Sequence, residues 1–175
     1  MGTFGGIFQS KAKRPRIRPA RTRLDRILRF IAINLALTCV VYAAWWYPSL
    51  PATIPTGLGP NGQPRGAGPS WTILALPGLG LFVVTVMLLL QRWPWLSNTV
   101  VEITEENAEV QYRLVNRLLS LVAIEVGIIF LLVTWQLIET AQGKAGNAAL
   151  PVILFATASW LPLLGWYFWA SLKEA

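Results

Sequence analysis

Four long apolar stretches stand out in the pattern of hydrophobic and polar positions along the chain. Each contains at most one charged residue, and they cover residues 27–47, 71–91, 118–137 and 150–172. The hydrocarbon core of a bilayer is about 30 Å thick, and a helix of about 20 apolar residues crosses it. Because backbone polar groups find no water there, runs of this length take the form of helices. The pattern predicts an all-α integral membrane protein with four transmembrane helices.

The polar segments around these stretches predict the rest of the organisation. We expect a basic tail over residues 1–26, a transmembrane domain over residues 27–172 and a short end over residues 173–175. A basic region followed by an apolar run is also the order found in a cleaved signal peptide. However, bulky Trp45, Trp46 and Tyr47 follow the first run where small residues would mark a cleavage site. The sequence therefore favours a first run that is retained as a span.

Lysine and arginine are distributed unequally between the two sides that four spans define. All of the fifteen basic residues except Arg65 and Lys144 fall on the side of the two termini. Short loops rich in Lys and Arg stay on the cytoplasmic side. We therefore expect both termini in the cytoplasm, and the loops at 48–70 and 138–149 outside.

The tryptophans indicate the ends of the spans independently. All nine except Trp160 lie close to an end of a predicted span. The amphipathic indole ring prefers the headgroup level of a bilayer, so this distribution supports the predicted boundaries.

Composition excludes several kinds of catalytic site. Hydrophobic residues make up 54% of the chain and charged residues only 13%, and there is no histidine. A Ser-His-Asp triad, a histidine-ligated zinc site and the usual haem ligation therefore cannot form. The single cysteine, Cys39, lies in an apolar run and is expected to pack as a small apolar side chain. We expect no enzyme activity, no metal and no cofactor.

The loop after the first apolar run is rich in turn-forming residues. Residues 50–71, LPATIPTGLGPNGQPRGAGPSW, contain five prolines and five glycines, a composition that predicts neither a helix nor a regular strand. The segment resembles the signature of a bacterial membrane-protein family, domain of unknown function 1648, with the pattern L-P-x-x-I-P-x-H-F-x-x-x-G-x-x-D-x-W-G-S. Residues 103–119 and 135–141 resemble two further parts of short members of that family. The loop residues that match the pattern are Leu50, Pro51, Ile54, Pro55, Gly62 and Gly68.

The resemblance implies a bacterial inner-membrane protein, related to the N-terminal domain of SdpI-type immunity and signalling proteins, whose short members have no assigned activity. This chain departs from the pattern at several positions. Gly57 replaces the histidine and Leu58 the phenylalanine, while Arg65 replaces an acid and Ala67 a tryptophan. The loop keeps its turn-forming residues and loses the polar chemistry. We expect a rigid cap over the outer ends of the first two spans.

Glu125 is the only acidic residue inside a predicted span. It lies about 12 Å along a helix from Arg117, near the middle of the bilayer. An ionisable residue at that depth is a functional-site hypothesis. In one interpretation, a neutral Glu125 hydrogen-bonds to Asn34, Thr38 or Ser120 and joins helices. In the other it handles protons or ions, which the lack of further carboxyl groups in the spans disfavours.

The polar segment at 104–117 is predicted to begin a helix before the third span. Thr104 can cap its first turn, and Val110, Leu114 and Leu118 form an apolar stripe. We expect this segment to lie along the membrane as an elbow that leads into the span.

The basic tail allows two interpretations. Anionic lipid attracts a juxtamembrane basic segment by about 1 kcal/mol per Lys or Arg. Alternatively, the tail docks onto a partner protein through apolar anchors and arginines that pair with specific acids. Nucleic acid is not expected as a partner, because neither an aromatic stacking pattern nor a known binding module accompanies the charge. The candidate docking residues are Phe4, Ile7, Phe8, Arg14, Arg16 and Arg18.

Two classes of function remain for a non-enzymatic membrane protein of this kind. It is either a small accessory subunit of a larger membrane complex, such as a respiratory or photosynthetic one, or a free-standing sensor or immunity-type protein. The first class predicts other membrane subunits as partners. The second predicts a ligand at the outer loop.

Overall fold

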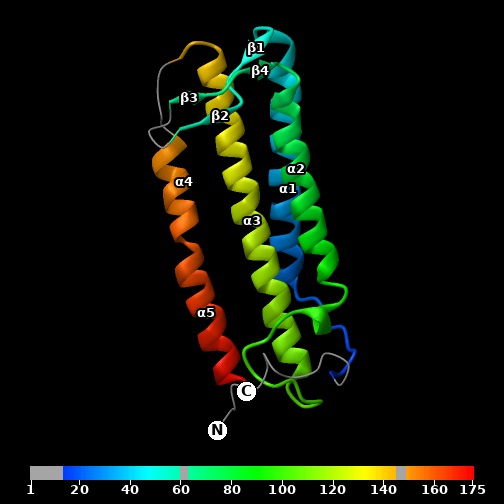
Figure 1. The fold of residues 1–175 in the computed structure, drawn as a ribbon. Coiled ribbons are helices and arrows are strands. Elements are labelled where there is room, and N and C mark those ends of the chain that lie inside the picture. The colour runs from blue at the N-terminus through cyan, green and yellow to red at the C-terminus, as the bar shows by residue number, and fades with distance from the viewer. Residues whose placement is uncertain (1–13, 60–62, 145–148) are drawn as a thin grey trace.

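A computed structural model describes residues 14–59, 63–144 and 149–175 of the chain. The protein is mostly helical, and its helices run roughly parallel to one long axis (Figure 1). Short 3-10 helices, η2 and η3, follow the first and second long helices at Tyr47–Ser49 and Pro94–Leu96. The α-helices are α1 (Arg23–Trp46), α2 (Thr72–Leu90), α3 (Ala108–Ala141), α4 (Ala149–Ala158) and α5 (Trp160–Lys173).

Helix α3 is central to the bundle. Helices α1 and α2 pack against it and against each other, whereas α4 and α5 lie along its other side (Figure 1). Small residues allow the close packing of α1 and α3, because Ala36 and Ala123 are buried and Gly127 lies against the Leu35 side chain. On the far side, α4 and α5 make their main contacts with α3.

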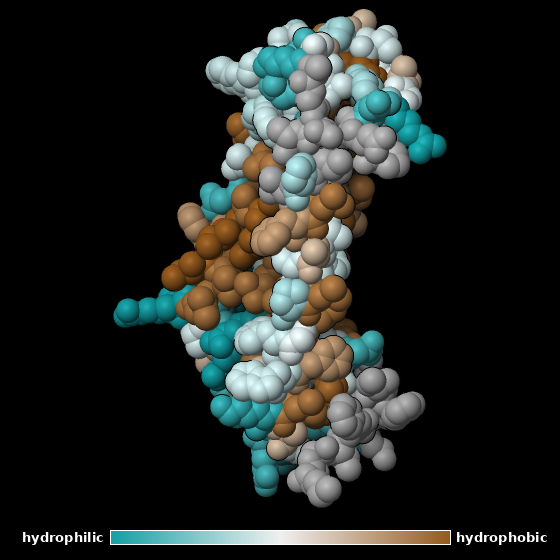
Figure 2. Space-filling model, turned by 90° about the vertical axis from the view of Figure 1, so that its left-hand side faces the viewer, coloured by the Kyte–Doolittle hydropathy of each residue, from teal (hydrophilic) through white to brown (hydrophobic). Residues whose placement is uncertain are grey.

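Three described helices, α1, α2 and α3, are long and apolar enough to cross a membrane. This agrees with the predicted class of helical membrane protein. Apolar side chains gather across the middle of the face shown in Figure 2, between more polar surfaces toward the two ends. The exposed tryptophans Trp45 and Trp71 lie at one end of their helices, as expected for side chains at a membrane interface.

The predicted fourth span at 150–172 is divided into α4 and α5 at Ser159. Pro162 explains the division, because it has no N–H to donate to the carbonyl group of Ala158. At the break, the single hydroxyl hydrogen of Ser159 is shared between the Ala156 carbonyl oxygen and Glu125 Oε1, each 2.6 Å from Ser159 Oγ. The two helices still continue one another along α3 in Figure 1.

Helix α3 corrects the prediction of an elbow at 104–117. The helix is continuous over 34 residues, from Ala108 to Ala141. At about 1.5 Å per residue it is roughly 51 Å long, well beyond the ~30 Å of a hydrocarbon core. Thr104 does act at its start, where the Thr104 N–H donates to Asn107 Oδ1 at 2.9 Å and the Asn107 N–H donates to Thr104 Oγ1 at 3.3 Å.

The loop between α1 and α2 contains strands, which its proline and glycine content argued against. We call residues 53–59 and 63–69 the hairpin. Its strands form two short antiparallel ladders, which meet at Gly66, where φ is 71° and interrupts regular pairing. The ladders pair β1 (Thr53–Ile54) with β4 (Gly68–Pro69), and β2 (Gly57–Leu58) with β3 (Pro64–Arg65).

The two ends of the bundle differ in chemistry. We call the end with the hairpin the hairpin end. The opposite end carries residues 14–22 and the connection at 91–107, and we call it the arginine end. Because the helices alternate in direction, α1 begins and α5 finishes at the arginine end (Figure 1).

Candidate functional site

Glu125 meets the break between α4 and α5. Its Oε1 accepts a hydrogen bond from the Ser159 hydroxyl group at 2.6 Å. Its Oε2 is buried and has no hydrogen-bond partner among the described residues. Glu125, in the middle of α3, therefore lies beside the break between α4 and α5.

The predicted partners of Glu125 lie elsewhere. Asn34 donates to the Phe30 carbonyl oxygen of its own helix at 2.8 Å, and Thr38 is exposed on α1. Ser120 accepts from the Gln91 amide at 2.8 Å. No hydrogen bond joins these three residues to Glu125 in the part of the chain that the structure describes. The sequence analysis did not predict Ser159 as the partner of Glu125. A serine three residues before a proline in an apolar run could have indicated a polar contact at a helix break.

A polar network joins α1, α2 and α3 at the arginine end. Arg29 Nη1 donates to Gln91 Oε1 at 2.6 Å and to the Leu88 carbonyl oxygen at 3.2 Å. Gln91 Nε2 donates to Ser120 Oγ and to the Asn116 carbonyl oxygen, at 2.8 and 3.1 Å. Gln91 is buried, so this side chain fixes all three helices relative to one another.

An ion pair adds a second connection between α1 and α3. Arg117 Nε lies 2.8 Å from Asp25 Oδ1. The other carboxylate oxygen of Asp25 accepts from the Thr22 N–H and hydroxyl groups, at 2.7 and 2.8 Å. The contact from the Thr22 N–H, together with the Asp25 N–H that donates to Thr22 Oγ1 at 3.3 Å, forms the capping box that starts α1 at Arg23, four residues before the predicted span.

The described part of the basic tail is hydrogen-bonded to the connection between α2 and α3. Arg14 is buried and donates to the Ser97 carbonyl oxygen at 2.6 Å. Arg18 Nε donates to the Arg92 carbonyl oxygen at 3.2 Å. Of the predicted docking arginines, only Arg16 is exposed without a contact of this kind among the described residues. The predicted anchors, Phe4, Ile7 and Phe8, lie outside the described residues.

A buried polar pair holds α5 against α3. Gln111 Nε2 donates to the Ser171 carbonyl oxygen at 2.9 Å, and the Ser171 hydroxyl group donates to Gln111 Oε1 at 2.6 Å. Both residues are 0% exposed. Beside this pair, a cavity of about 230 Å³ opens between Leu114 of α3 and Trp169 of α5. The described residues contain no group of three or more side chains suited to hold a metal ion.

The matched loop residues anchor and shape the hairpin. Ile54 is 2% exposed and packs with Ile73 of α2 and Ile138 of α3, and Leu50 packs against the same cluster. A side chain at Gly68 would place its Cβ atom 2.6 Å from Thr56 Cγ2, so the Thr56 side chain would have to move to admit it. Pro51 is exposed and Pro55 half-buried, and Gly62 lies outside the described residues. The motif thus caps all three long helices, not only the first two.

Comparisons with known proteins agree with the resemblance found in the loop. Neither curated proteins nor solved structures give a match to the chain. A family model does match, over the second half of α1, the hairpin and the first half of α2. That model is described as a domain of unknown function (DUF1648) and matches residues 35–81, which confirms the family resemblance over that stretch.

Proposed function

We propose that the protein is a non-enzymatic, accessory subunit of a larger membrane assembly in the bacterial inner membrane. In this proposal α4 and α5 together form a fourth span. The arginine end faces the cytoplasm, which places both termini there in agreement with the distribution of basic residues.

The observation that carries the proposal is the incomplete cover of the central helix. Between residues 121 and 133 of α3, only Ala123 and Gly127 are buried, and the others are half-buried. A helix at the centre of a finished bundle is normally enclosed by its neighbours. Here α1 and α2 cover one side and α4 only part of the other. A transmembrane helix of a partner subunit would complete that cover.

The exposed apolar surface of α4 and α5 supports the same proposal. Phe155 and Leu161 are each 76% exposed, and they lie on the two sides of the break at Ser159. Because lipid chains are as apolar as leucine, membrane helices associate through close packing and interhelical hydrogen bonds. Helices α4 and α5 make their main contacts with α3 alone, so their outer surface is available for packing against another helix.

Native mass separation in a mild detergent tests the proposal. We expect the chain to migrate with a larger complex, and migration as an isolated 19.4 kDa species contradicts the proposal. A double Phe155→Ala, Leu161→Ala variant should then be released from the complex. The matched control is Phe30→Ala with Phe82→Ala on α1 and α2, where the side chains are 67% and 65% exposed. Equal release by both pairs would show that α4 and α5 are not the docking face.

A free-standing sensor is the second candidate, and the hairpin is the observation that favours it. Each of its two ladders has only two strands, so strand edges are available for pairing with an extended peptide. The sensor would migrate alone in the same separation. A peptide partner would then be expected to protect the hairpin from limited proteolysis without protecting the connection at 91–107.

A further inference from the structure

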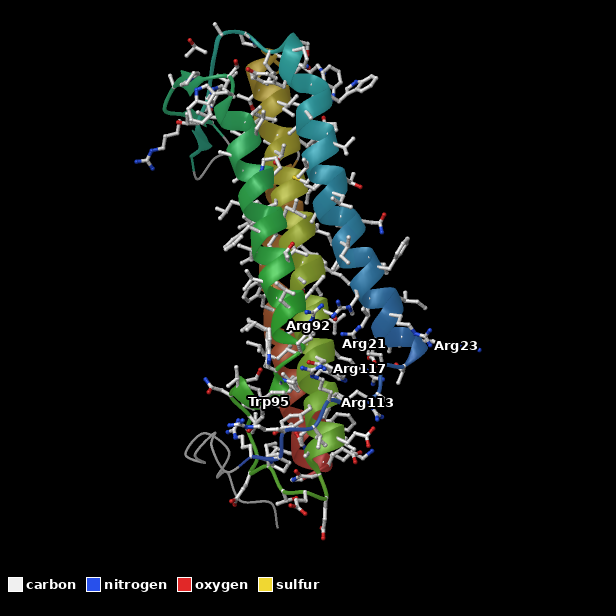
Figure 3. All side chains as sticks on the ribbon, turned by 90° about the vertical axis from the view of Figure 1, so that its right-hand side faces the viewer. Arg21, Arg23, Arg92, Trp95, Arg113 and Arg117 are labelled. Atoms are coloured by element: carbon white, nitrogen blue, oxygen red, sulfur yellow. The ribbon has the colours of Figure 1, made fainter. Side chains whose placement is uncertain are left out.

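Three arginines crowd together where α1 begins and α2 ends. Arg29 lies within range of Coulomb repulsion from both Arg21 and Arg92. Arg21 lines a small cavity with Arg29 and Gln91, and Arg92 directly follows Gln91 in the chain. Figure 3 shows Arg21 and Arg92 at this end of the bundle together with Arg113 and Arg117, whereas Arg23 points away to the side.

The protein supplies little negative charge to this group. Asp25 lines the same cavity, but its two oxygens are already bound by Arg117 and Thr22. The side chains of Arg21 and Arg92 make no hydrogen bond or ion pair with any described residue. Arg29 uses only Nη1, for the contacts with Gln91 and Leu88. Three guanidinium groups therefore retain unused N–H donors, with no acid of the described chain to neutralise them.

The chemistry of the group fits a phosphate. Guanidinium groups bind phosphate oxygens through two parallel N–H···O bonds, and these charge-assisted bonds are stronger than neutral ones. The phosphodiester of a lipid offers two unesterified oxygens, as a carboxylate does, but its tetrahedral phosphorus places them and the two ester oxygens in more than one plane, so guanidinium groups on different segments can approach it together. Arg29 is held in place by Gln91, so one of the three donors is already oriented.

The apolar surface beside the group indicates which phosphate it binds. At the level of Arg29, α1 carries the exposed side chains of Ile27 and Phe30, which are 54% and 67% exposed. There α2 presents Leu89 and Leu90, each 41% exposed, in the last turn before Arg92. A phospholipid satisfies both surfaces at once, because its phosphate meets the arginines while its acyl chains cover the leucines and the phenylalanine.

We propose that Arg21, Arg29 and Arg92 form a specific site for the phosphate of an anionic phospholipid headgroup. The site differs from a diffuse attraction between lipid and the basic tail, because it depends on which arginines are present and not only on their number. It requires that α1 and α2 lie in a bilayer. It does not require that the chain be a subunit of a larger assembly.

The test compares two double variants of the full-length protein that lose the same charge. One is Arg21→Gln with Arg92→Gln, and the other is Arg16→Gln with Arg23→Gln. All four arginines are exposed, and their side chains make no hydrogen bond or ion pair with any described residue. Native mass spectrometry in mild detergent measures the binding of added phosphatidylglycerol. Phosphatidylcholine and inorganic phosphate, at the same concentrations, serve as the two comparison ligands.

We expect phosphatidylglycerol to remain bound to the wild type and to the Arg16 and Arg23 variant. The Arg21 and Arg92 variant should bind it at least about tenfold more weakly than that control, since each lost charge-assisted bond is typically worth tenfold or more. Equal weakening by both variants would establish diffuse attraction and overturn the site. If inorganic phosphate binds as tightly as phosphatidylglycerol, the site is one for a soluble phosphate, and the proposal of a lipid site is wrong. Equal binding of phosphatidylcholine would show that headgroup charge is not recognised.

Discussion

The contact between Glu125 and Ser159 predicts an asymmetry between two substitutions. Ser159→Ala removes the donor at 2.6 Å and leaves both carboxyl oxygens of Glu125 without a partner among the described residues. Glu125→Leu removes the carboxyl group itself, and the Ser159 hydroxyl group keeps its bond to the Ala156 carbonyl oxygen. A substitution that leaves a polar group away from water without a partner costs more than one that leaves every remaining polar group paired.

The magnitudes follow from hydrogen bonds between membrane helices. Such bonds contribute about 0.6 kcal/mol on average and about 1.7 kcal/mol at most. Ser159→Ala should therefore lower the free energy of unfolding by about 1–2 kcal/mol, because it adds an unpaired oxygen to the lost bond. Glu125→Leu should change it by less than about 0.6 kcal/mol. Glu125→Gln should also be mild, since the amide oxygen can still accept from Ser159.

Chemical denaturation in mild detergent micelles, followed by circular dichroism, measures these differences. The double variant Ser159→Ala, Glu125→Leu closes the cycle and should be about as stable as Glu125→Leu alone, because Ser159 then has no carboxyl partner to lose. If Glu125→Leu destabilises the protein more than Ser159→Ala, the argument from unpaired oxygens is wrong. A function of the protein that is lost in Glu125→Gln at full stability would instead support proton or ion handling.

Two further predictions concern helix packing and topology. Gly80→Ala should lower the free energy of unfolding by about 1–3 kcal/mol in the same denaturation assay, because its Cβ atom would lie 2.9 Å from two ring carbons of Phe130. Gly78→Ala is the control and should cost nothing, because no atom lies within 4 Å of its Cβ position. Equal effects of the two substitutions would refute the packing of Gly80 against Phe130. For topology, a cysteine introduced at Thr53 in a cysteine-free background should react with a membrane-impermeant reagent in intact cells, while one at Asn98 should be protected; the reverse pattern would place the arginine end outside.

The class of helical membrane protein could be predicted from the sequence because the bilayer imposes a strong rule. A crossing helix needs a long apolar run, and interruptions such as Arg29 or Glu125 are rare enough to stand out. The ends of helices were less predictable. Helix α3 extends beyond its apolar run because polar Gln111 is buried against Ser171, a residue 60 positions away. The local sequence around Gln111 or around Ser171 does not predict that pairing.

The position of the basic tail was also beyond sequence reasoning. Charge and juxtamembrane position suggested lipid or a partner protein. The structure instead uses Arg14 and Arg18 to bind carbonyl oxygens at Ser97 and Arg92. Every residue has a carbonyl oxygen, so such an acceptor leaves no trace in the sequence. The number of arginines in the sequence therefore does not separate those that hold the chain together from those, such as Arg21, whose N–H donors remain unused.

This division of the arginines changes how the orientation of the protein should be understood. Arg14, Arg18 and Arg117 are bound by oxygens of the chain itself. Arg14 and Arg18 hold the tail against the connection at 91–107, and Arg117 holds α1 against α3. Arg21 and Arg92 make no such contact among the described residues, and their charge remains available at the level where the apolar surfaces of α1 and α2 end. Hydrogen bonds to carbonyl oxygens do not neutralise Arg14 or Arg18, so the fold leaves most of this charge in place and sets the backbone positions from which it projects. Fixed donors can select a headgroup, whereas a free tail of equal charge can only be attracted to the surface.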